Sequence, residues 1–146
     1  MKRHFVSLAA LGFSIMMGTA AIAETAEPHW PAGAKVFFVE PKDGAVITGP
    51  VKVVMGVEGI DIAPAGSDKP RTGHHHILID TPLPTGKNAH APLPANDHIK
   101  HFGKGQTETE LTLAPGKHTL QLLIADSNHI PHDPALASDQ ITITVK

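Results

Sequence analysis

The sequence predicts an all-β fold, an immunoglobulin-like antiparallel β-sandwich of about seven strands with long histidine-rich loops. Short runs rich in β-branched and aromatic residues recur along the chain, and proline- and glycine-containing turns separate them. No segment of the expected mature chain shows a helical period over eleven or more residues. These observations together exclude the helical and α/β classes.

Each expected strand has its own pattern. The expected strands are Lys35–Glu40, Val51–Val57, His75–Asp80, Thr107–Leu113, His118–Ala125 and Ile141–Val145. Residues 41–44 (PKDG) form a turn, because proline fixes its own φ and the Asp-Gly pair tolerates tight geometry. Residues 81–105 are polar and rich in proline, and a connection of this length in a compact domain is usually functional. A seventh strand is expected to be short or missing within this segment.

The first 23 residues have the features of a secretory signal peptide. A short basic start precedes the apolar run from Phe5 to Gly18, and Ala21-Ile22-Ala23 fits the small-x-small pattern that signal peptidase cleaves. The apolar run is shorter than the roughly 20 residues that a membrane-spanning helix needs. We therefore expect cleavage near Ala23, a periplasmic or secreted chain, an irregular lead-in over residues 24–33 and a single immunoglobulin-like domain over residues 34–146.

The composition of the expected mature chain narrows the function classes. Without Lys2 and Arg3 it carries 10 basic and 14 acidic residues, which argues against a nucleic-acid partner. No later segment is apolar enough to span a membrane. Cysteine is absent, which excludes thiolate metal sites, and Met55 is the only methionine left. All but one of the 11 histidines remain, and this bias is the strongest compositional signal.

Three clusters contain most of these histidines. They are His74-His75-His76 in "TGHHHILID", His98 and His101 in "DHIKHFG", and His129 and His132 in "DSNHIPHD". Residues two apart in a strand point to the same face, with Cα atoms about 6.6–6.8 Å apart. His74 and His76 can therefore converge on one ion, while His75 turns to the opposite face.

An immunoglobulin-type topology should bring the three clusters to one end of the sandwich. The strand at residues 75–80 begins at that end, and so does the strand that follows His98 and His101. The strand at residues 118–125 finishes there, just before His129 and His132. His118 begins its strand at the other end and should lie outside the cluster.

Clustered imidazoles favour a divalent transition metal, since imidazole nitrogen suits copper(II), zinc or nickel. The expected metal ligands are His74, His76, His98, His101, His129 and His132. We expect His75, Asp80 and Asp126 to lie beside them, because nearby carboxylates orient the N–H groups of ligating rings. The same histidines could instead form a metal-free hydrogen-bond network that joins the loops.

These residues lead us to expect a non-enzymatic periplasmic metal-binding protein that buffers or delivers a divalent ion. The alternative is an envelope interaction or structural module, whose loops contact an envelope protein or a polysaccharide. A metal-dependent enzyme with Asp80 or Asp126 as the base is a third hypothesis. No nucleophile motif, glycine-rich phosphate loop or pair of catalytic carboxylates supports it, so no catalytic residue is expected.

Several long motifs resemble a bacterial secreted family known as domain of unknown function 4399. They are "VEPKDGAVITGPVKVVMGVEG", "TGHHHILID", "DHIKHFGKGQTETELTL" and "PGKHTLQLLIADSNHIPHDP", and the resemblance runs from Val36 to Val145. It implies a periplasmic or envelope-associated β-domain with no established reaction. The family's histidine motifs correspond to His74, His75, His76, His98, His101, His129 and His132. Ile99 and Ser127 stand where the family frequently has further histidines, which leaves the number of ions open.

Overall fold

The computed structural model describes residues 29–146, so the expected signal peptide at residues 1–23 and the first half of the lead-in at 24–33 lie outside the described residues. The described chain is all-β apart from one short 3₁₀ helix, η1 (Gly86–His90). The strands are β1 (Lys35–Glu40), β2 (Val46–Ile47), β3 (Val51–Glu58), β4 (Asp61–Ile62), β5 (Thr72–Ile79), β6 (Ile99–His101), β7 (Glu108–Leu111), β8 (Gly116–Ala125) and β9 (Ile141–Val145).

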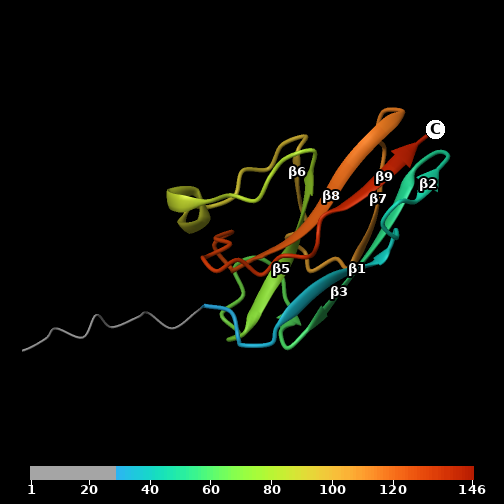
Figure 1. Ribbon diagram of the computed structural model, residues 1–146. Coiled ribbons are helices and arrows are strands. Elements are labelled where there is room, and N and C mark those ends of the chain that lie inside the picture. The colour runs from blue at the N-terminus through green and yellow to red at the C-terminus, as the bar shows by residue number, and fades with distance from the viewer. Residues whose placement is uncertain (1–28) are drawn as a thin grey trace, which may run out of the picture.

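The strands form two sheets that face each other as a sandwich (Figure 1). The smaller sheet has the order β1-β3-β7, and the larger has the order β2-β9-β8-β5-β4, with β6 also paired to β5. Pairing is antiparallel except in two short parallel pairs, β2 with β9 and β4 with β5. This order matches an immunoglobulin-type sandwich, in which strands A, B and E lie in one sheet and strands C, F and G in the other. Here β1, β3 and β7 correspond to A, B and E, and β5, β8 and β9 correspond to C, F and G.

One hydrophobic core lies between the sheets. Alternate residues of β3 and β8 point into it, namely Val51, Val53 and Met55 from β3 and Leu120, Leu122 and Ile124 from β8. Trp30 closes one end of the core, where its Nε1–H donates a 2.8 Å hydrogen bond to the carbonyl oxygen of Pro131. Among the described residues, none lies in a helix long and apolar enough to cross a membrane.

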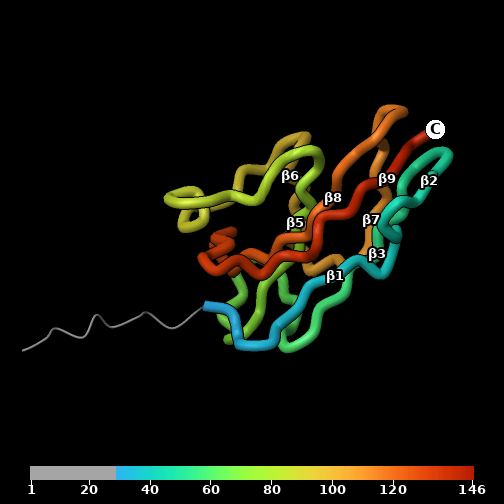
Figure 2. Tube along the Cα trace, viewed as in Figure 1, coloured from blue at the N-terminus to red at the C-terminus, as the bar shows by residue number. Residues whose placement is uncertain are grey.

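The chain segments 81–98 and 126–138 lie on the outer side of the larger sheet and meet each other (Figure 2). The backbone N–H of Leu93 donates to the carbonyl oxygen of His129 at 2.9 Å, which joins the two segments. A bridge between Leu123 and Ala137 places the end of the second segment beside β8, within the sheet. His74 and His76 on the outer face of β5 are fully buried, so other parts of the chain cover that face where β5 begins.

His101 lies in a strand and not in the loop that we expected, and His98 lies just before that strand. Ile99–His101 forms β6, which pairs antiparallel with β5 in the register His76↔His101 to Leu78↔Ile99. This strand occupies the edge of β5, while the expected strand at residues 107–113 is shortened to β7. The pairing decides which histidines can meet.

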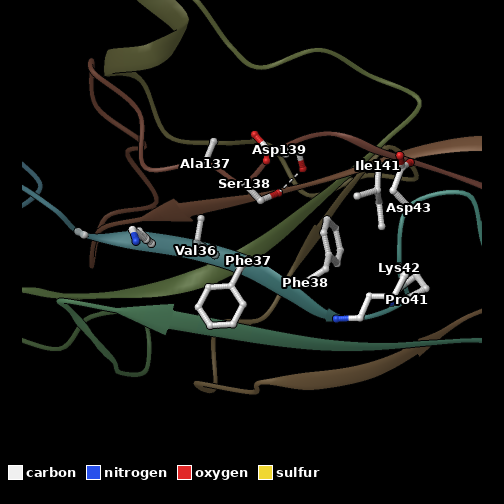
Figure 3. A pocket seen from close by; sticks show the side chains of 12 residues that line it. Val36, Phe37, Phe38, Pro41, Lys42, Asp43, Ala137, Ser138, Asp139 and Ile141 are labelled. Atoms are coloured by element: carbon white, nitrogen blue, oxygen red, sulfur yellow. Dashed lines mark hydrogen bonds between the residues drawn. The ribbon is translucent and has the colours of Figure 1, made fainter.

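A cleft of about 450 Å³ lies between β1 and the segment from Ala137 to Ile141 (Figure 3). Val36 and Phe38 lie on the β1 side, and Ser138, whose hydroxyl donates to the carbonyl oxygen of Asp139 at 2.7 Å, lies on the other. No histidine lines this cleft. It is therefore separate from the histidine cluster.

Candidate metal centre

β5 divides the histidine triplet between its two faces. His74 and His76 point to the covered outer face of the sheet, where both are fully buried and their ring centroids lie 4.8 Å apart. His75 lies opposite Ile124 and shares the inner face with the core residue Ile77. The strict two-residue period of a strand produces this division.

β6 adds a third imidazole to the outer face. Its register places His101 directly beside His76, with ring centroids 5.1 Å apart, and the His101 ring lies 5.0 Å from that of His74. The ring of His101 lies against Gly103, where an added Cβ would overlap its Cε1 and Nε2 atoms. Only glycine at position 103 therefore leaves the His101 ring in this place.

The loop after β8 adds the fourth imidazole. Asp126 Oδ1 accepts hydrogen bonds from the backbone N–H groups of Asn128 and Ile130, which fold the loop into a tight turn. His129 lies in this turn with φ +66°, a left-handed conformation that is uncommon outside glycine. Its Nδ1 atom lies 3.1 Å from Nε2 of His74, so the two rings share a hydrogen bond.

His74, His76, His101 and His129 can each place one ring nitrogen within 4.8 Å of the other three. Zinc–nitrogen distances of about 2.0–2.1 Å in a tetrahedral site require nitrogens about 3.4 Å apart. Small ring rotations would therefore be enough for one ion to contact all four. We refer to this set as the four-histidine cluster.

The environment keeps the buried rings of the cluster neutral at pH 7. Burial, and then the proximity of His101 and His129, lowers the pKa of His74 to about 4. Burial, followed by the neighbouring histidines, lowers the pKa of His76 to about 3. The pKa of His101 is also lowered, by burial and then by His129. Neutral imidazoles carry the lone pairs that a metal ion needs.

His75 is a buried imidazole without a polar partner. Neither ring nitrogen has a hydrogen-bond partner among the described residues, and the side chain is 0% exposed. Burial, and then His74, lowers its pKa to about 4. His75, which we expected beside the metal ligands, instead lies on the opposite face of β5 toward the core.

Two expected site residues lie away from the cluster. His98 lies beside Ile79, where its Nδ1–H donates to the Ile79 carbonyl oxygen at 2.9 Å. His98 lies just before β6, whereas His101 is the last residue of that strand and lies beside His76. Asp80 follows the far end of β5, away from the cluster, and forms a hydrogen bond with His118 there. His118 thus lies outside the cluster.

His132 and Asp126 form a second group together with His29. Nε2 of His132 lies 2.7 Å from Oδ2 of Asp126, so this carboxylate orients the His132 ring. His29 was not among the expected site residues, because it is isolated in the sequence and reaches the site only through the fold.

The fold and this cluster define a β-sandwich domain with a group of histidines that could hold a metal ion at one end. The profile of the family described as "Domain of unknown function (DUF4399)" matches residues 53–146, so the chain belongs to this family. No curated protein and no solved structure matches the chain. The resemblance noted in the motifs is thus confirmed.

Replacing His75 with leucine should stabilise the metal-free protein. The change removes two unpartnered buried nitrogens, which we expect to raise the free energy of unfolding by about 1–3 kcal/mol at pH 7.5. The folded pKa of about 4 lies below the ordinary 6.5, so protonation opposes folding increasingly as the pH falls from 6.5 toward 4. The advantage of the variant should therefore be larger at pH 5.

Urea unfolding at the two pH values, with chelator present, measures this difference. His90→Leu, at an exposed position, is the matched control. Equal stability of His75→Leu and the unmodified chain at both pH values would contradict the prediction.

Replacing Asp80 with asparagine should weaken the fold in a pH-dependent way. Both ring nitrogens of His118 face acceptors, Asp80 Oδ2 at 2.7 Å and the Ala114 carbonyl oxygen at 2.8 Å, and these bonds raise the pKa of His118. Burial acts to raise the pKa of Asp80, but its hydrogen bonds to His118 and Thr119 hold the pKa below the ordinary value.

The His118 contribution is fully present below pH 6.5 and is lost as the pH rises through its raised pKa. The Asp80 contribution is present above pH 3.8 and is lost at lower pH. Asp80→Asn should therefore lower the free energy of unfolding by about 0.5–1 kcal/mol at pH 5.5, the range for an exposed ion pair. Thermal unfolding at pH 5.5 and 8.5 tests this, and a loss that is larger at pH 8.5 would be incompatible with an ion pair.

Proposed function

We propose that the protein is a non-enzymatic metal-binding protein of the periplasm that holds one divalent ion of copper, zinc or nickel in the four-histidine cluster. The observation that carries the proposal is the convergence of four imidazoles from β5, β6 and the loop after β8 within 4.8 Å of one another. The secretory features of residues 1–23 support the location.

The burial of the cluster favours a bound ion. His74 Nδ1 and His76 Nδ1 are buried and have no hydrogen-bond partner among the described residues. Each such atom costs about 1–3 kcal/mol of desolvation. Coordination can use one nitrogen of each ring and leave the other to an acceptor, which fixes the tautomer.

A second candidate function is a structural or envelope-interaction module without metal. The hydrogen bond between His74 Nε2 and His129 Nδ1 favours it, because it already joins β5 to the loop after β8. In that case a chelator would leave the thermal stability of the purified protein unchanged. A bound ion would instead raise the stability in proportion to its affinity and concentration.

Removal of His101 should weaken metal binding with little effect on the fold, because its side chain is exposed. We expect the affinity of tag-free protein for copper(II) or zinc to fall by at least about tenfold in His101→Ala, as for the loss of groups that support metal sites. Isothermal titration measures the affinity, with the buried His76→Ala as a second variant.

His90→Ala is the matched control, since His90 is exposed and belongs to neither histidine group. An unchanged affinity in both His101→Ala and His76→Ala would refute binding at this cluster. The ion that binds most tightly at the same pH identifies the preferred metal.

Alanine at position 103 should lower the metal affinity through His101. The new methyl group would displace the end of the His101 ring, so we expect an affinity loss of up to about tenfold with an unchanged unfolding temperature. In a double-mutant cycle, Gly103→Ala should cost nothing further in a His101→Ala background. An additional loss in that background would show that Gly103 acts by another route.

A further inference from the structure

We propose that His29, Asp126 and His132 form a second, outer site for a divalent transition-metal ion. One candidate ligand atom from each residue lies within 4.8 Å of those of the other two. Two imidazoles and one carboxylate are a donor set that binds zinc and related ions with open coordination positions. This site shares no residue with the four-histidine cluster and does not depend on the function proposed for it.

The loop after β8 builds the acidic half of the site. Asp126 uses Oδ1 to hold the turn and directs Oδ2 at Nε2 of His132, 2.7 Å away. Burial acts to raise the pKa of Asp126, but the hydrogen bonds from Ile130, His132 and Asn128 hold it below its ordinary value. The carboxylate is therefore charged at neutral pH, and its charge offsets the cost of removing water from a bound cation.

The N-terminal segment supplies the third ligand. The ring of His29 stacks on that of His132, with centroids 3.6 Å apart and planes inclined by 5°. Trp30, anchored to Pro131, fixes His29 in this position and contacts its ring edge-on at 4.6 Å. Burial, and then His132, lowers the pKa of His29, so the ring is neutral and free to ligate at pH 7.

Backbone strain marks the same loop. His132 has φ +65°, and His129, the residue of this loop that joins the four-histidine cluster, has φ +66°. Non-glycine residues in this conformation concentrate at functional sites, where the surroundings hold them in place. The two strained positions send one imidazole to each group, which explains why the loop adopts this shape.

The outer site is accessible to solvent. His29 is exposed, and a depression of about 320 Å³ lined by His29, Asp126 and Thr72 opens beside it. An ion would replace the hydrogen bond between His132 Nε2 and Asp126 Oδ2, and both atoms would then bind the ion. The stacked rings would tilt so that His29 reaches the same ion.

Metal stoichiometry and the fluorescence of Trp30 test the outer site directly. Trp30 is the only tryptophan of the chain, and it contacts the rings of His29 and His132. The variants are His29→Ala, Asp126→Asn and His101→Ala, with His90→Ala as the control. Native mass spectrometry of tag-free protein with zinc counts the ions, and copper(II) titration reports quenching of Trp30.

We expect His101→Ala and His90→Ala to keep the outer zinc ion of the unmodified protein, with Trp30 still quenched by copper(II). His29→Ala and Asp126→Asn should each lose the outer ion, with its affinity reduced at least about tenfold. One ion in the unmodified protein, unaffected by His29→Ala but lost in His101→Ala, would overturn the outer site and leave the four-histidine cluster intact. Loss in His29→Ala without loss in Asp126→Asn would overturn the three-ligand assignment.

Discussion

The antiparallel pairing of β5 with β8 is the constraint on which the histidine site depends. The register runs from His74↔Ala125 to Ile79↔Leu120, and it turns Ile77 into the core while His74 faces outward. A slip by one residue would exchange the faces and expose the apolar side chains. Each buried aliphatic side chain stabilises the fold by about 1.5–3 kcal/mol, so the core holds the imidazoles in their positions.

The site combines rigid and strained supports. His74, His76 and His101 lie on paired strands. The backbone hydrogen bonds between these strands fix the direction of each Cα–Cβ bond, and only the side-chain rotamer remains free. His129 lies on a loop in a left-handed conformation, which costs about 1–3 kcal/mol unless the surroundings enforce it. The two backbone bonds to Asp126 Oδ1 enforce it here. Asp126 is therefore important for both groups of histidines.

The sequence predicted the sandwich and the convergence of three distant segments, because strand alternation and chain direction are visible in short apolar runs. It did not predict that His98 lies away from the cluster, because the pattern gave no sign of a strand that begins at Ile99 and carries His101 alone to the site. The contact of His29 with His132 depends on the anchoring of Trp30 to Pro131, 101 residues away. No local pattern encodes such a contact.

The unpartnered nitrogens of the buried rings are the physical basis of the metal centre that we propose. A neutral imidazole has one donor and one acceptor, so four rings need several partners to be satisfied without an ion. Among the described residues, the four-histidine cluster contains one ring-to-ring hydrogen bond, and His74 Nδ1 and His76 Nδ1 have no partner. Apolar residues would fill the same face beside Leu78 and Leu123 at lower cost. In the proposed metal centre, an ion bound by all four lone pairs would offset this cost.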